Sequence, residues 1–126
     1  MKIEPIKVVE KPWGRETWFS LTKDYCFKEI IVYAGCKTSL QYHEQKEETN
    51  LIVAGYARVT VQHPLTKEYV VSEVHPGAVF HFKPGEVHRF EAIYGVSLVM
   101  HECSSCQVDD VVRIEDSYGR EGTSTP

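Results

Sequence analysis

Apolar and polar side chains alternate with a period of two in the middle of the chain. Within residues 56–63, Ala57, Val59 and Val61 are apolar and the residues between them are polar. Successive side chains of a β-strand point to opposite faces. The alternation therefore predicts a strand with one buried face and one solvated face.

Other short runs rich in β-branched and aromatic residues follow from Tyr25 onward, and no stretch shows sustained helical periodicity. Pro-Gly and Tyr-Gly pairs separate the later runs. We expect further strands at 40–43, 51–54, 68–71, 79–82, 88–93 and 96–102. Short, closely spaced strands without helices predict an all-β sandwich or barrel.

The length and composition of the chain predict a single globular domain. The chain has 126 residues, 42% of them apolar, which suffices for a single domain over residues 1–126 with its own core. Its Gly-, Ser- and Thr-rich end, residues 119–126, is a predicted mobile tail.

Charge and hydropathy exclude several classes of partner. A net charge of -4 gives no basic field for a nucleic-acid backbone, so we expect no nucleic-acid partner. No apolar run approaches the ~20 residues needed to span a bilayer, so we expect no membrane partner. The N-terminal residues also lack the apolar core of a signal peptide, and a cytoplasmic location is expected.

Four cysteines, Cys26, Cys36, Cys103 and Cys106, are expected to be reduced thiols in such a compartment. Cys103 and Cys106 have the spacing of half a zinc site or of a redox pair. The chain has no second CxxC and no βαβ pattern around this one, so free thiols are the preferred interpretation.

The residues with metal-ligand chemistry gather in the stretch 35–55. If residues 40–43 are extended, Gln41 and His43 project to the same face, and Glu48 can return toward them. His88, after a Pro-Gly turn, is a candidate fourth ligand. Such N and O donors could hold one divalent metal ion, and ligand type alone does not choose among zinc, iron, nickel and manganese.

Spacing around these residues resembles the two sequence motifs of the cupins. Gly35 and Gly55 bound the first motif, in which Gln41 takes the place of the usual first His, and His88 belongs to the second. The tracts KPWGRE at 11–16 and DDVVRIEDSYGR at 109–120, with SLQ-x-H between them, narrow the resemblance. Together they are similar to the cupin domain of type II mannose-6-phosphate isomerases, a domain often fused to mannose-1-phosphate guanylyltransferase.

This resemblance implies a fold, a cofactor and a ligand. The fold would be a cupin double-stranded β-helix, a jelly-roll barrel. It would hold one divalent metal, zinc as the first expectation, with iron, manganese or nickel as alternatives. The ligand would be a sugar phosphate or sugar nucleotide, and a homodimer is expected because small cupins often pair.

The resemblance also implies an activity, the metal-dependent isomerisation of a sugar phosphate. Conversion of an aldose phosphate to a ketose phosphate moves a proton between neighbouring carbons. It needs a polarised carbonyl, which a metal supplies, a base, and a cationic grip on the phosphate. His101 and Glu102 are the candidate bases; only one can point inward from a strand, and Glu102 falls where the family has a Glu. The candidate phosphate-binding residues are Lys46, Arg89, Arg120 and Lys28.

The chain departs from the family just after Gln41. Type II isomerases carry a run like MHHHRAEHW there, whereas residues 42–50 read YHEQKEETN. This weakens the case for chemistry on mannose phosphate itself. The alternative is a non-catalytic cupin that binds a sugar or sugar nucleotide; a metal-dependent oxygenase is a third class, disfavoured because the resemblance points to sugars.

Overall fold

The computed structural model describes residues 3–124, which form β-strands and contain no helix. The strands are β1 Lys7–Lys11, β2 Gly14–Leu21, β3 Cys26–Val32, β4 Leu40–His43, β5 Glu48–Ala54, β6 Ala57–Gln62, β7 Tyr69–Val74, β8 Val79–Phe82, β9 His88–Ala92, β10 Leu98–Ser104 and β11 Val111–Glu115. The predicted all-β class is confirmed. Nothing in residues 3–124 forms a helix long and apolar enough to cross a membrane.

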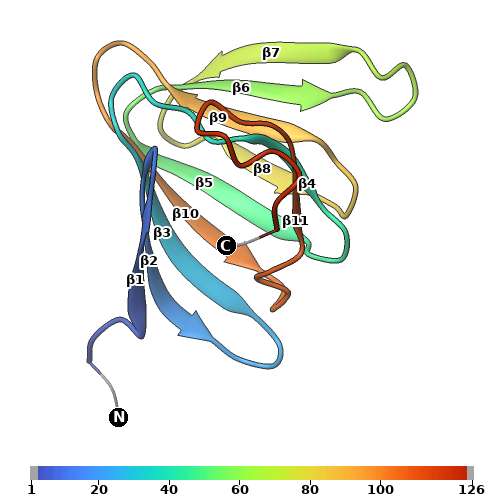
Figure 1. Cartoon of the computed structure of the whole chain (residues 1–126). Coiled ribbons are helices and arrows are strands. Elements are labelled where there is room, and N and C mark those ends of the chain that lie inside the picture. The colour runs from blue at the N-terminus through green and yellow to red at the C-terminus, as the bar shows by residue number, and fades with distance from the viewer. Residues whose placement is uncertain (1–2, 125–126) are drawn as a thin grey trace.

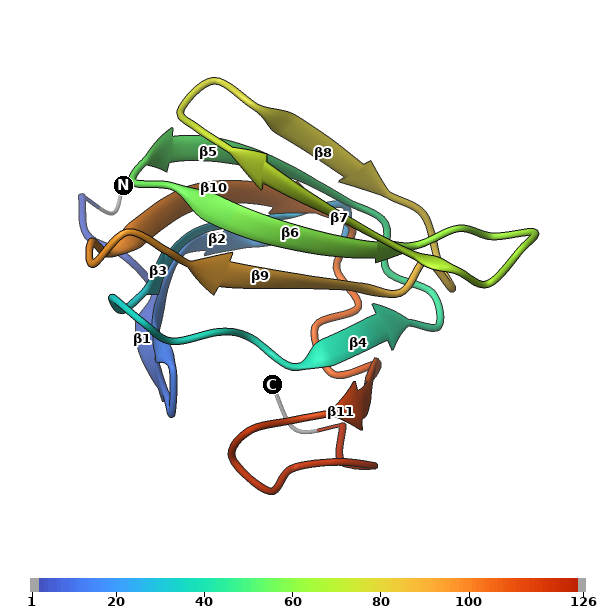
Figure 2. The same ribbon diagram turned by 90° about the horizontal axis from the view of Figure 1, so that it is seen from above.

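The strands form two sheets that face each other (Figure 1). One sheet has six strands in the order β1-β2-β3-β10-β5-β8, and the other has five in the order β11-β4-β9-β6-β7. Every pairing is antiparallel among the described strands. Seen from above, β11 and the segment after it lie at the β4 edge of the five-stranded sheet (Figure 2). Neighbours in space are therefore often far apart in sequence, as in the pairing of β3 with β10.

The alternation in residues 56–63 corresponds to β6, whose Ala57 and Val59 are buried. Gly35 and Gly55, which bound the first motif, have positive φ angles of 76° and 80°, as expected for glycines at such turns. The strand expected at 96–102 instead begins at Leu98 and continues to Ser104. Its ends are set by pairing with β3 and β5 on either side, which a local pattern does not reveal.

The inner faces of the two sheets enclose the hydrophobic core. Both tryptophans are buried, and the Trp18 side chain is almost fully enclosed. The core cluster consists of Trp13, Ile30, Val32, Ile52, Ala57, Val59, Phe82, Phe90, Ala92, Leu98 and Met100. Several of these side chains also form the wall of the polar cavity described below.

After β11 the chain folds back on itself. The Gly122 amide donates to the Arg113 carbonyl at 2.9 Å, and the Arg120 guanidinium binds the Asp116 carboxylate. These contacts bring Arg120 to the cavity. The mobility expected of residues 119–126 stays a prediction, and residues 125–126 of that tail lie outside the described residues.

Candidate functional site

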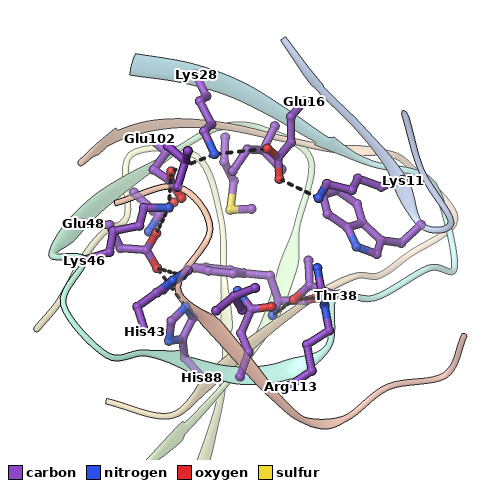
Figure 3. A pocket seen from close by; sticks show the side chains of 18 of the residues that line it. Lys11, Glu16, Lys28, Thr38, His43, Lys46, Glu48, His88, Glu102 and Arg113 are labelled. Atoms are coloured by element: carbon purple, nitrogen blue, oxygen red, sulfur yellow. Dashed lines mark hydrogen bonds and ion pairs between the residues drawn. The ribbon is translucent and has the colours of Figure 1, made fainter. Parts of the chain in front are cut away.

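A cavity of about 60 Å³ lies between the sheets, with room for a few water molecules (Figure 3). Its lining is unusually rich in ionisable groups for the inside of a barrel. They are the cations Lys11, Lys28, Lys46, Arg113 and Arg120, the carboxylates Glu16, Glu48 and Glu102, and the imidazoles His43 and His88. Burying so many charges is costly unless they are paired or bind a ligand, so this cavity is the candidate site.

Three of the predicted metal ligands meet on one side of the cavity. His43 ends β4, Glu48 begins β5 and His88 begins β9. Nε2 of His88 lies 2.9 Å from Oε1 of Glu48, and Nε2 of His43 lies 4.0 Å from the same oxygen. Local extended structure at β4 and the β4–β9 pairing bring these donors together.

The far nitrogen of each imidazole is held by an acceptor. Nδ1 of His43 bonds Oδ1 of Asp110 at 2.9 Å, and Nδ1 of His88 bonds the Glu86 carbonyl at 2.9 Å. A carbonyl accepts only, so Nδ1 of His88 carries its proton and Nε2 faces the cavity. Partners of this kind orient imidazole ligands in metal sites.

The protonation states of these groups also suit metal binding. Burial, followed by the nearby Lys46 ammonium, lowers the pKa of His43 to about 4, so its imidazole is neutral at pH 7. A lone pair on His88 Nε2 and a carboxylate oxygen of Glu48 at 2.9 Å repel unless a cation lies between them. That cation is either a proton or a metal ion.

Gln41 completes the predicted donor set. It lines the cavity, pairs with His88 across β4 and β9, and its Oε1 accepts a hydrogen bond of 2.6 Å from Ser39. Within residues 3–124, no three His, Cys, Asp or Glu side chains are already positioned as a complete metal site. The donor chemistry of two imidazoles, a carboxylate and an amide oxygen nevertheless fits a divalent ion.

Beside these donors lies a buried ion cluster. The Lys46 ammonium is 2.9 Å from Oε2 of Glu102 and 3.3 Å from Oε2 of Glu48. Burial opposes ionisation of Glu48, but Lys46, with hydrogen bonds from Glu102 and His88, outweighs it and lowers the pKa of Glu48 well below its ordinary value. Burial, then the Glu48 charge, raises the pKa of Glu102 to about 7. Two neighbouring carboxyl groups thus differ in protonation.

The two candidate bases point in opposite directions, as alternation on β10 requires. Glu102 lines the cavity and its side chain is 6% exposed. His101 lies on the outer face, where its Nε2 is 3.0 Å from Oε2 of Glu29 and its ring packs against Phe19 and Phe27. The structure therefore does not place His101 at this site.

Of the four candidate phosphate-binding residues, three line the cavity and one does not. Arg89 does not line the cavity; it binds Oε1 of Glu115 at 3.1 Å and the Thr38 carbonyl at 2.9 Å. Lys46 and Lys28 line the cavity, but each is paired with a buried carboxylate. Arg120 lines the cavity and binds Asp116.

Sequence reasoning missed three charged residues of the cavity: Lys11, Glu16 and Arg113. Glu16 accepts hydrogen bonds from Lys28 at 3.1 Å and from the Trp18 indole at 3.0 Å. Burial opposes its ionisation, but Lys28 and Lys11 outweigh this and lower the pKa of Glu16. The signal was present, because all three lie in the two end tracts used for the family resemblance.

All four cysteines are free, and none lines the cavity within the described part of the chain. Cys103 is exposed, and Cys106 donates to the Lys23 carbonyl at 3.2 Å.

Comparison with known proteins gives the family and the fold. Residues 2–116 match the family described as mannose-6-phosphate isomerase C-terminal. The chain is 32% identical over 115 residues to the mannose-1-phosphate guanylyltransferase ManC of Salmonella typhimurium, covering 89% of this chain and 23% of that protein. It is 30% identical over 115 residues to the alginate biosynthesis protein AlgA of Pseudomonas aeruginosa, with the same coverage. The chain thus spans about a quarter of the length of these relatives.

Among solved structures, the capsular polysaccharide assembling protein CapF of Staphylococcus aureus aligns with a TM-score of 0.77. The alignment covers 89% of this chain and 35% of that one at 21% identity, which speaks for the fold alone. The predicted cupin double-stranded β-helix is thereby confirmed. With its fold, its end tracts and its match over residues 2–116, the chain belongs to the mannose-6-phosphate isomerase C-terminal family of cupin domains.

Proposed function

We propose that this domain is a metal-dependent sugar-phosphate isomerase that interconverts an aldose and a ketose. The observation that carries the proposal is the neighbourhood of Glu102. Its carboxyl group, with a pKa raised to about 7, shares one cavity with the donors His43, Glu48 and His88. A general base works best when its pKa lies near the working pH.

Each of the cavity residues would have its own role in the reaction. His43, Glu48, His88 and Gln41 would hold the divalent ion, which when bound would polarise the substrate carbonyl as a Lewis acid. Glu102 would take a proton from the hydroxyl-bearing carbon next to that carbonyl and return it to the former carbonyl carbon. The proton of that hydroxyl would pass to the former carbonyl oxygen, so that the ketose forms without net gain or loss of protons. Lys46, hydrogen-bonded to Glu102 at 2.9 Å, would fix the orientation of its carboxyl group.

The relatives support a sugar ligand. They are named for mannose-1-phosphate guanylyltransferase and for alginate biosynthesis, and this chain corresponds to about a quarter of each. A sugar phosphate or sugar nucleotide is therefore the proposed ligand class. A homodimer and a cytoplasmic location stay predictions.

Metal analysis tests the proposed ion. Purified protein should contain a divalent metal, zinc first among the expected ions, and the double variant His43→Ala/His88→Ala should lack it. His75→Ala is the matched control, because His75 lies exposed in a turn. Equal metal content in the double variant and the control would place the metal elsewhere.

Kinetics test the proposed base. Glu102→Gln should lower kcat by about a hundredfold or more on a panel of hexose and heptose phosphates, while ligand affinity stays nearly unchanged. Glu115→Gln, at an exposed carboxylate outside the cavity, is the control and should keep wild-type kinetics. If metal-loaded wild type binds sugar phosphates without isomerising any of them, the isomerase proposal fails.

One observation favours the second candidate, a non-catalytic cupin that binds a sugar or sugar nucleotide. Nζ of Lys46 lies 2.9 Å from Oε2 of Glu102. A carboxylate held in a buried ion pair is less available to accept a proton from a substrate. In that case neither wild type nor Glu102→Gln would isomerise a sugar phosphate. Changes in the cavity would then be detected only as changes in ligand affinity.

A further inference from the structure

The sign of the charge inside the cavity is opposite to that of the whole chain. The chain carries a net charge of -4, yet the cavity lining has five cationic side chains against three carboxylates. A surplus of buried positive charge is costly in a low-dielectric interior unless an anion offsets it. The question is which of these cations an anion would meet.

Lys46 and Lys28 are held by carboxylates of the cavity lining, and Arg120 is held by Asp116 just outside it. Lys46 lies between Glu102 and Glu48, and Lys28 is 3.1 Å from Oε1 of Glu16. The Lys28 ammonium also lies 4.3 Å from the centre of the Trp18 ring. Neither lysine can bind an anion without giving up a short ion pair.

Lys11 is different. Its side chain is 5% exposed, and its ammonium has one carboxylate neighbour in residues 3–124, Oε2 of Glu16, at the long distance of 3.8 Å. Glu16 already accepts hydrogen bonds from Lys28 and Trp18 through its other oxygen. Burial accordingly lowers the pKa of Lys11 to about 8, in spite of the Glu16 charge. The Lys11 ammonium is thus buried with incomplete compensation.

Two arginines of the C-terminal segment lie near enough to act on Lys11. Arg113 and Arg120 both line the cavity, and the charge of each disfavours the protonated form of Lys11. Nη1 of Arg113 donates to Oγ1 of Thr123 at 2.8 Å, which fixes the guanidinium. Arg120 uses Nε and Nη2 for Asp116, so the same carboxylate fixes its plane. The Lys11 ammonium thus shares the cavity with two positioned guanidinium groups that disfavour its charge.

We propose that Lys11, Arg113 and Arg120, which line one cavity, form a subsite for a phosphate monoester. Lys11 lies across the cavity from Glu48 and Glu102 (Figure 3). A phosphate carries up to two negative charges and offers three acceptor oxygens, which matches two guanidinium groups and an ammonium better than a monovalent carboxylate does. The assignment rests on the proposed sugar-phosphate function and moves the phosphate grip away from Lys46, Lys28 and Arg89.

Calorimetric titration with inorganic phosphate tests the subsite directly, without turnover. Lys11→Met should weaken phosphate binding by about tenfold or more, and Lys11→Arg should keep it within about threefold, because the charge returns. Lys23→Met is the matched control, since Lys23 is an exposed lysine in the β2–β3 turn and should bind phosphate as wild type does. Thermal unfolding of each variant verifies that it is folded.

Arg120→Met gives an independent variant at the most exposed of the three residues. Because it also removes the partner of the buried Asp116 carboxylate, phosphate binding is compared below the unfolding temperature of the variant. This substitution should also weaken phosphate binding by about tenfold. The subsite is overturned if wild type does not bind phosphate, or if Lys11→Met and Arg120→Met bind it as tightly as wild type. Metal content and Glu102-dependent turnover are measured separately, so failure of the subsite is distinguishable from failure of the proposed isomerase.

Discussion

Replacing Lys46 by Met tests whether the buried ion cluster holds the cavity together. Methionine keeps most of the side-chain length and removes the ammonium, which lies 2.9 Å from Glu102 and 3.3 Å from Glu48. The side chains involved are 4%, 6% and 3% exposed, so the two carboxylates are largely shielded from bulk solvent. Removing one partner of a buried ion pair costs about 3 to 5 kcal/mol of folding free energy.

The lower end of that range is expected at pH 7. Glu102, with its pKa already raised to about 7, can take up a proton once Lys46 is gone, which limits the cost to about 3 kcal/mol. Adding Glu102→Gln should restore part of the loss, because Glu48 is then the one carboxylate left beside the position of the lost ammonium.

Equilibrium unfolding in urea, with metal removed by a chelator, measures this free energy. The exposed-lysine variant Lys23→Met should lie within about 0.5 kcal/mol of wild type. A loss below about 1 kcal/mol in folded Lys46→Met would refute the reasoning, because it would mean that Glu48 and Glu102 do not depend on the ammonium.

Three further outcomes are expected. Gly14→Ala should destabilise the protein by more than about 2 kcal/mol in urea unfolding, because its Cβ would overlap the Ile31 carbonyl oxygen; wild-type stability would contradict this. Asp116→Ala should cost about 1.5 to 3 kcal/mol, since the buried carboxylate accepts two hydrogen bonds from the Arg120 guanidinium, and no change would mean that the C-terminal segment is not held by this pair. In metal-free protein, wild type should lose stability relative to Glu102→Gln as the pH rises from about 4.5 to about 7, because the folded pKa of Glu102 lies above its ordinary value of 4.5. Urea titrations of both proteins at several pH values measure the difference, from which the opposite contribution of His43, whose pKa is lowered to about 4, cancels because both proteins carry it.

The sequence alone determined the features that depend on local pattern. Alternation around Ala57 and Val59 predicted β6, and the extended run 40–43 put Gln41 and His43 on one face, where both line the cavity. Strand geometry has a period of two whatever the rest of the chain does, so such inferences need no knowledge of the partner strand. The same rule predicted that only one of the β10 neighbours His101 and Glu102 points inward, and Glu102 is the one that lines the cavity.

The tertiary structure decided which charges meet. Glu102 contacts Lys46 across 56 residues of sequence, and Arg113 reaches the cavity through the pairing of β11 with β4. Strand order and register fix such contacts, and a shift of one residue would turn Arg113 to the opposite face. A basic residue in a sequence therefore does not disclose whether it will be neutralised, as Lys46 is, turned outside, as Arg89 is, or left buried with incomplete compensation, as Lys11 is. That outcome depends on the carboxylates brought beside each cation by strands distant in sequence, because electrostatic energy in a buried site is set by neighbours in space.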